Sequence, residues 1–238
     1  GAALPPAMSR RERGAVEMAV AAALEASEGK SSGTYMPLAG SCTYAPMPVG
    51  MDGEEAERLH EERLLPPEVF DAKWSSWGLD RDWPHGRGLW VSTTRTLDVR
   101  VNWAEHIEVS VREKGVDVPG AFKRLRDVLA RLEGALEVRR RPFVRHDRWG
   151  MLLADPGSTG TGLLVSLRVR LPRVSCDKAL PEWLADFGLV AEPGHSPGEL
   201  VLMNKYALGV EEPALANAVM RSVAALCERE KDLEARRS

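Results

Sequence analysis

Long apolar runs are absent from this chain of 238 residues. A helix that crosses a bilayer needs about 20 consecutive apolar residues, so the sequence predicts no transmembrane segment of its own. An excess of one charge is also absent, because 32 Lys and Arg residues stand against 35 Asp and Glu residues, a formal net charge of −3. A nearly balanced charge favours no polyanion, and we predict no nucleic-acid partner.

Cysteine is scarce. Cys42, Cys176 and Cys227 match no zinc or redox spacing, and an odd number of cysteines leaves no closed set of disulfides. We therefore predict free thiols, no metal site and no cofactor. The aromatic content is uneven, since seven tryptophans accompany only four Phe and three Tyr. An excess of Trp is typical of cores and of interface anchors alike.

The first third of the chain is mainly helical. It contains, in order, a helix opened by a capping box at Ser9 and Glu12 and closed by Gly29, a loop with one short strand over residues 30–55, and a charged helix over 54–65 ended by Pro66 and Pro67.

The remainder mixes strands and helices. Extended or helical patterns predict strands at 89–93 and 96–113, a helix from Pro119, strands at 149–154 and 162–172, a helix at 181–189, a strand at 199–204 and a helix from Pro213. The strand at 162–172 alternates apolar and polar residues, as antiparallel strands with one buried face do. The fold class is α+β, an antiparallel sheet flanked by helices, and we predict a single domain over residues 1–238.

The stretch VNWAEHIEV (101–109) has the look of a small active site, with Glu105 beside His106. In a strand, adjacent residues point to opposite faces. We therefore predict a structural histidine and a surface carboxylate rather than an acid–base pair.

A family resemblance begins at RDWPHGRGLW (81–90). It resembles RDWPDARGIW of the phosphagen kinases, the ATP:guanidino phosphotransferases such as creatine and arginine kinase. VNWAEHIEV resembles their VNEEDHLRV, and GSTGTGL (157–163) resembles the end of their CPSNLGTGL. These motifs occur in the same order as in the family, and the resemblance covers almost the whole chain. The resemblance implies the glutamine-synthetase-type catalytic-domain fold, without the family's N-terminal helical domain and without the first strand of the catalytic domain.

The resemblance also implies which residues stand at catalytic positions. The family holds phosphates with several arginines and orients the guanidinium with a glutamate. In this chain the glutamate position carries Ala104, three arginine positions carry Glu108, Leu164 and Glu192, and the reactive cysteine position carries Asp155. We therefore predict no catalytic residue at these positions.

Three arginines remain as candidate anion ligands: Arg87, Arg168 and Arg170. Arg168 and Arg170 could hold an anion in the former nucleotide cleft or pair with Glu108 and close it, and we favour the pairing. Trp103 could fill that cleft or anchor a partner. The basic stretch 139–148 could dock an acidic partner, although a solvated loop is the more common role of such a cluster.

Three functions compete at this point. We predict a catalytically inactive phosphagen kinase-like protein that serves as an accessory subunit of a larger assembly. By analogy with mitochondrial members of the family, we expect a mitochondrial respiratory membrane complex rather than the cytoplasm. A regulatory pseudokinase that binds a nucleotide or phosphate is the alternative, and an active kinase with relocated groups is the third. The expected partners are protein subunits, including a second phosphagen kinase-like chain.

Overall fold

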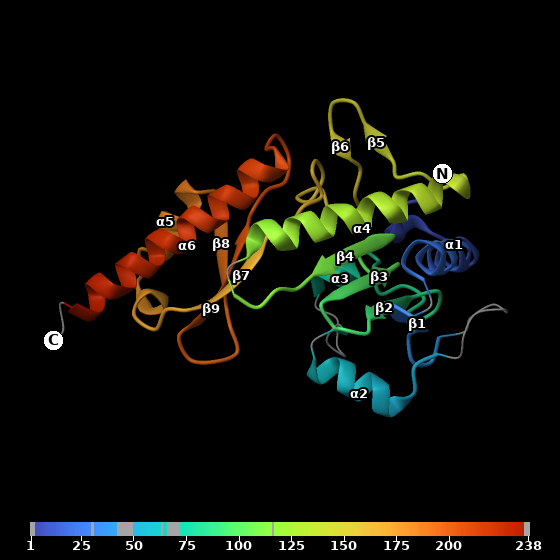
Figure 1. The fold of residues 1–238 in the computed structure, drawn as a ribbon, viewed down its shortest axis with the longest axis horizontal. Coiled ribbons are helices and arrows are strands. Elements are labelled where there is room, and N and C mark those ends of the chain that lie inside the picture. The colour runs from blue at the N-terminus through green and yellow to red at the C-terminus, as the bar shows by residue number, and fades with distance from the viewer. Residues whose placement is uncertain are drawn as a thin grey trace. The chain divides into compact units, whose positions relative to one another are not determined.

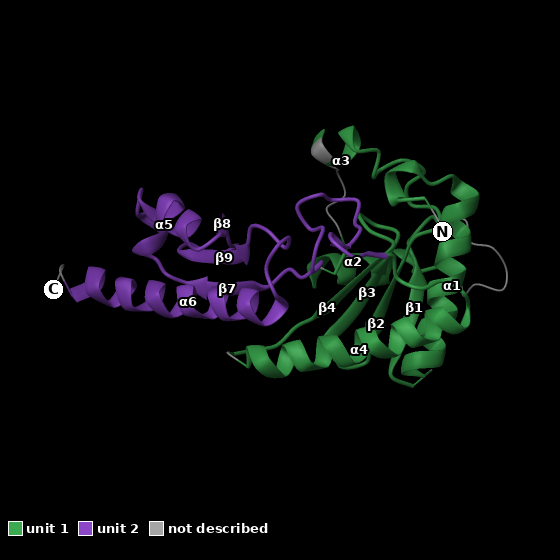
Figure 2. Ribbon diagram, turned by 90° about the horizontal axis from the view of Figure 1, so that it is seen from above, with its two compact units in different colours: residues 1–144 green, residues 145–238 purple. Residues whose placement is uncertain are grey.

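The computed structural model describes residues 3–29, 31–41, 50–62, 64–65, 72–115 and 117–235. The chain forms two compact units, residues 1–144 (unit 1) and 145–238 (unit 2), coloured green and purple in Figure 2. Each unit is described by itself. Cys42, Pro66 and Pro67 lie outside the described residues, and the single domain over 1–238 stays a prediction.

Unit 1 is built on a four-stranded antiparallel sheet (Figure 1). Its strands lie in the order β1 (Gly33–Pro37), β2 (Gly88–Ser92), β3 (Leu97–Val101) and β4 (Ile107–Val111). Two helices, α1 (Arg10–Glu28) and α4 (Val118–Val138), pack together on one face of this sheet. The buried residues of this layer are Val20, Ala23, Leu24, Trp90, Val99, Val101, Leu132 and Leu136.

Local sequence signals account for these two helices. The Ser9 side chain accepts from the backbone N–H of Glu12 at 3.3 Å while the Glu12 carboxylate accepts from Ser9, so the predicted capping box is confirmed. Gly29 follows α1 at φ 79°, a conformation that favours glycine. Asp117 caps α4 by accepting from the N–H of Gly120 at 3.0 Å, and a proline stands in the first turn.

The opposite face of the sheet is covered by loops and short helices. These helices are α2 (Gly53–Glu61) and α3 (Ala72–Ser76), while η1 (Pro5–Ala7) precedes α1. A second core forms here, with Leu38, Met51, Leu59, Leu64, Leu89, Val91 and Trp103 buried. Both faces of β2 and β3 are therefore packed, and any charge on this face of β3 must find a partner inside the protein.

Unit 2 is built on a smaller antiparallel sheet in the order β7 (Ser166–Arg170), β9 (Glu199–Asn204) and β8 (Leu189–Pro193). Its remaining elements are the β5–β6 hairpin (Arg145–His146 and Gly150–Met151), η2 (Val174–Cys176), α5 (Leu180–Asp186) and α6 (Glu212–Ala235). One face of the sheet packs on α5 and α6 through residues such as Leu202, Leu184 and Val219. The α+β class, with antiparallel sheets flanked by helices, is confirmed.

Three strand predictions need correction. The run 96–113 is two strands, because Asn102 takes φ 59° and the chain turns back on itself over residues 102–106. Residues 189–193 are strand β8, where we predicted no strand. The strand expected at 149–154 is reduced to Gly150–Met151.

Candidate active site

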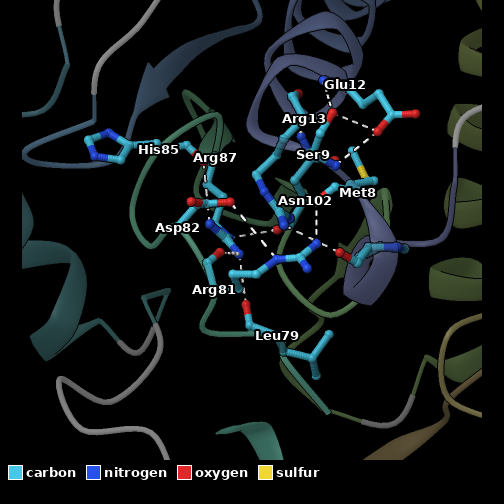
Figure 3. A network of polar contacts seen from close by, with 11 residues as sticks. Met8, Ser9, Glu12, Arg13, Leu79, Arg81, Asp82, His85, Arg87 and Asn102 are labelled. Atoms are coloured by element: carbon cyan, nitrogen blue, oxygen red, sulfur yellow. Dashed lines mark hydrogen bonds and ion pairs between the residues drawn. The ribbon is translucent and has the colours of Figure 1, made fainter.

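The turn over residues 102–106, between β3 and β4, is built around Asn102. Asn102 is fully buried and adopts the left-handed conformation that Asn tolerates better than most residues. Its Nδ2 donates to the carbonyl of Arg13 at 2.9 Å and to that of Gly86 at 2.7 Å. The turn is therefore fixed both to α1 and to the loop that leads into β2 (Figure 3).

Arg87 is the second support of this turn. It is fully buried, and its guanidinium donates to the backbone carbonyls of Asn102 at 2.8 Å, Leu79 at 2.7 Å, Arg81 at 3.0 Å and His85 at 3.3 Å. Burial lowers the pKa of Arg87 to about 9. Because these donors are used inside the protein, we do not retain Arg87 as an anion ligand; it braces the loops around the turn.

Ala104 and Glu108 stand at two positions that match catalytic residues of the family. Ala104 lies in the turn, and the side chain of Glu108 extends from β4 to the turn. The Oε1 atom of Glu108 accepts from the N–H of Ala104 at 3.1 Å and from the N–H of Glu105 at 3.3 Å. Its Oε2 atom lies 3.6 Å from Nη1 of Arg100. The Glu108 carboxylate therefore holds its own turn together, with its charge balanced by a neighbour on β3.

Glu105 and His106 lie in the turn and not in a strand, so the argument from alternating strand faces is wrong. His106 nevertheless has a structural partner, because its Nε2 atom is 2.8 Å from the carbonyl oxygen of Ala3. Burial lowers the pKa of His106. The imidazole links the N-terminal segment to the turn, which fits the structural role predicted for it.

A charged cluster beside the turn, formed by Asp98, Arg100 and Arg112, was not predicted from the sequence. Asp98 is fully buried on β3, with ion pairs to Arg112 and to Arg100, whose Nε lies 3.6 Å from Asp98 Oδ2. Burial raises the pKa of Asp98, and the two arginines oppose that shift. The available signal was LDVRV (97–101), which places Asp and Arg on one face of a strand whose other face is apolar.

Trp103 fills the interior below this cluster. It is only 4% exposed, and its ring meets that of Trp83 edge to face with centroids 6.1 Å apart. The guanidinium of Arg100 lies over the Trp103 ring at 5.2 Å. Of the two roles considered for Trp103, the structure supports filling rather than anchoring a partner.

In unit 2, Arg168 and Arg170 project from the exposed face of β7. Nε of Arg168 lies 3.3 Å from Oε1 of Glu199, and the Arg168 side chain remains 53% exposed. Glu108 has an ion pair with Arg100 within unit 1, and the predicted pairing of Arg168 and Arg170 with Glu108, which would join the two units, stays a prediction. Arg168 and Glu192 are both aligned with Val201 of β9, so these two charges share a face of the sheet.

The two other matched positions lie in loops of unit 2. Leu164 precedes β7 and is 63% exposed, offering only an apolar side chain. Asp155 accepts from the N–H of Gly157 at 3.0 Å and from the hydroxyl of Ser158 at 3.1 Å. Asp155 therefore fixes the start of the glycine-rich loop.

Two negative findings apply to the residues that the structure describes. Among them, no group of three His, Cys, Asp or Glu side chains is placed to hold a metal ion. No helix within the described ranges combines the length and the apolar character needed to cross a membrane.

The comparisons with known proteins all point to one family. The family described as ATP:guanido phosphotransferase, C-terminal catalytic domain, matches residues 15–233. Glycocyamine kinase of Hediste diversicolor is 30% identical over 241 residues, which cover 99% of this chain and 59% of that protein. Creatine kinase M-type of Gallus gallus is also 30% identical, over 98% of this chain and 60% of its own length.

Solved structures agree. Lombricine kinase superimposes with a TM-score of 0.86 at 26% identity, covering 99% of this chain and 64% of its own. The duplicated taurocyamine kinase from Schistosoma mansoni gives a TM-score of 0.83 at 27% identity, covering 97% of this chain and 31% of its own. The chain thus spans 59–60% of the length of the two curated kinases compared here.

These findings correct our prediction of function. We predicted a catalytically inactive accessory subunit, or alternatively a regulatory pseudokinase. The relatives are instead named as glycocyamine, creatine, lombricine and taurocyamine kinases, and none of these comparisons marks this chain as a pseudo-enzyme. The prediction that the chain is not an enzyme is therefore wrong.

Proposed function

The chain belongs to the ATP:guanido phosphotransferase family, and from that premise we propose that it transfers the terminal phosphoryl group of ATP to a guanidino compound. The observation that carries the proposal is the extent of the match, from residue 15 to residue 233 of 238. The buried supports of the turn within unit 1, Asn102 and Arg87, add to it, because they hold a segment that resembles a motif of the family in one conformation.

The reaction defines what the protein must supply. The bond between the γ-phosphorus and its bridging oxygen breaks and ADP leaves with that oxygen, a phosphorus–nitrogen bond forms, and the guanidino nitrogen releases a proton to solvent. Negative charge on the phosphoryl oxygens is stabilised by positioned cations. We propose Arg168 and Arg170 for this task, since both extend from the exposed face of β7 and can approach a phosphate. Mg²⁺ would enter with ATP as part of the substrate.

Several positions that match catalytic residues of the family carry side chains unsuited to contact the reacting groups. We propose that Ala104, Leu164, Glu192 and Asp155 make no contact with the reacting atoms. Asp155 holds its own loop, and the side chains of Ala104 and Leu164 carry no polar atom. Glu192, exposed on β8, would repel a phosphate.

A coupled assay for ADP tests the proposal. Purified protein with ATP-Mg²⁺ is offered glycocyamine, creatine, lombricine, taurocyamine or arginine in turn. We expect ADP formation that depends on one of these compounds and falls at least tenfold in the double variant R168A R170A, a loss of about 1.4 kcal/mol or more. R221A is the matched control, because Arg221 is exposed on α6 in the same unit. ADP formation equal to the blank with every compound would overturn the proposal.

We also propose that the chain pairs with a second phosphagen kinase-like chain, and that it acts in mitochondria. The pairing is supported by the relative described as a duplicated taurocyamine kinase. The location rests only on analogy with mitochondrial members of the family. Native mass determination on the endogenous protein, with fractionation of the cells, tests both: a monomeric mass refutes the pairing, and recovery outside mitochondria refutes the location.

A further inference from the structure

The guanidinium of Arg100 occupies a place that has the chemistry of a guanidinium-binding site. Carboxylates reach it from two sides, Asp98 of β3 through Oδ2 and Glu108 of β4 through Oε2, each at 3.6 Å. Below it lies the ring of Trp103, with its centroid 5.2 Å from the guanidinium carbon. We name the set of Asp98, Trp103 and Glu108 the carboxylate–indole box.

Each carboxylate of the box is held by a second partner. Asp98 uses Oδ1 for the ion pair with Arg112, so that Oδ2 is left for Arg100. Glu108 uses Oε1 to accept from two backbone N–H groups of the turn, so that Oε2 is left for Arg100. One oxygen of each carboxylate thus faces the guanidinium, while the other oxygen is held by a partner other than Arg100. Such preorganisation lowers the cost of binding a ligand.

Burial in the box decreases from its floor to its rim. The side chain of Asp98 is completely buried and Trp103 is 4% exposed, whereas the side chains of Arg100 and Glu108 are 23% and 29% exposed. A cation over an indole ring is bound more strongly when it is partly shielded from water. A planar guanidinium also matches two carboxylates better than an ammonium does. Because the side chains of Arg100 and Glu108 are partly exposed, a small ligand can reach the box from solvent when the Arg100 side chain is removed.

We propose that the carboxylate–indole box is a binding site for a guanidino group and that Arg100 fills it from within. An external guanidino compound competes with Arg100 for the same two oxygens and the same ring face. Arg100 is thereby an internal mimic of the substrate class, and the contact is self-inhibitory. The link to a guanidino substrate rests on the proposed function, whereas occupation of the box by a guanidinium ion does not.

The test is to empty the box and offer guanidinium from solution. R100A removes the internal occupant, and equilibrium dialysis with radiolabelled guanidinium chloride then measures binding, with sodium chloride balancing ionic strength. We expect R100A to bind guanidinium at least tenfold more tightly than the unchanged chain, or about 1.4 kcal/mol. Methylguanidinium should bind likewise, and methylammonium should bind more weakly.

Two matched variants show whether the box itself is responsible. R112A removes the other arginine of Asp98 but leaves Arg100 in place, so it should gain no guanidinium binding. The double variant R100A E108Q removes one carboxylate charge from the emptied box, and we expect it to lose most of the gain. Equal binding to R100A and R112A would overturn the proposal, because the effect would then be general attraction to an unpaired Asp98.

Poor folding of R100A would leave the proposal testable. Denatured R100A is then refolded by dilution into guanidinium or into sodium at equal concentration, below the range in which guanidinium denatures. Recovery in guanidinium alone supports the proposal; no recovery in either salt, with R112A recovering in both, counts against it. None of these readouts needs phosphoryl transfer, so failure of the box and failure of the proposed kinase activity are separate outcomes.

Discussion

The two sheets of this protein place their charges in opposite ways. On the β3–β4 face of unit 1, Asp98 is fully buried and Arg100 and Glu108 are mostly so, and each has its partner within the sheet or the adjoining turn. On β7 of unit 2, Arg168 and Arg170 extend into solvent, and Arg168 remains 53% exposed although it pairs with Glu199. Charges in the first sheet are therefore paired inside the protein, whereas Arg168 in the second sheet remains largely exposed.

The difference follows from how many faces of each sheet are packed. Both faces of β2 and β3 carry a core, so an unpaired charge there would be costly. The sheet of unit 2 buries one face against α5 and α6, and its other face can carry arginines at little cost. Four sets of substitutions test this difference between the two sheets.

The largest effect should come from Arg87. R87M leaves the carbonyls that Arg87 bridges without their buried donors, and we expect a loss of about 3–5 kcal/mol in the free energy of unfolding. R168M, the same change on the open sheet, should alter it by less than about 0.5 kcal/mol. Urea unfolding with hydrogen exchange read separately for each unit measures both. Similar losses for the two variants would contradict the comparison.

A pH effect of about 3 kcal/mol should come from Glu17 on α1. Glu17 is fully buried, its Oε1 accepts from the Tyr35 hydroxyl at 3.0 Å, and burial raises its pKa from 4.5 to about 7. The folded state therefore holds the proton more tightly than the unfolded state. The stabilisation is complete below pH 4.5, declines as the pH rises toward 7, and is constant above that.

Unfolding free energies measured at pH 5 and pH 8 test this effect. E17Q should remove most of the pH dependence. Y35F should extend it to higher pH, because the Tyr35 hydroxyl lowers the pKa of Glu17 and its loss raises that pKa further. A slope unchanged in E17Q would assign the pH dependence to another group.

Glu108 should have an intermediate effect on stability. E108A removes the acceptor for the N–H groups of Ala104 and Glu105 and one partner of Arg100, so we expect a loss of about 1–3 kcal/mol. The control is E113A, because Glu113 pairs with the exposed Arg124, and such a pair contributes about 0–1 kcal/mol. Thermal melting of both variants measures the two losses. Equal losses in E108A and E113A would show that Glu108 does not stabilise the turn.

The smallest effect on stability should come from the open sheet. R168A R170A should change the free energy of unfolding by less than about 0.5 kcal/mol, while calorimetry shows the affinity for ATP reduced at least tenfold, or about 1.4 kcal/mol. A stability loss as large as that of E108A would mean that these arginines, too, maintain the fold.

Much of the fold could be predicted from local signals. The capping box at Ser9, the proline near the start of α4 and the alternation of β7 each determine an element directly, and all three were recognised. The break at Asn102 was missed, since VNWAEHIEV has no Gly or Pro and the turn there is held by residues distant in sequence, through the contacts of Asn102 with Arg13, Gly86 and Arg87. Strand β8 was also missed, although its hairpin with β9 is local, because LVAEP (189–193) is short and ends in a proline, which seldom continues a strand.

The site was predictable only in part, and for a similar reason. Short sequence motifs identified the family and the positions that match its catalytic residues. They did not show which contacts the replacement side chains make in this chain. Glu108 looked like a charge that repels phosphate or attracts Arg168. The cross-strand register places it opposite Arg100, and that register depends on a turn whose position the sequence did not give.

Direct detection of the product tests the central claim, because contaminating ATPases release ADP but do not form a phosphorus–nitrogen bond. Phosphorus-31 NMR of the protein with ATP-Mg²⁺ and each guanidino compound resolves a phosphoguanidino signal from phosphate and ATP. The account predicts that this signal grows with time, keeps its rate in R221A and is largely lost in R168A R170A. Conversion of ATP to ADP and free phosphate alone, with no phosphorus–nitrogen signal for any compound, would contradict it.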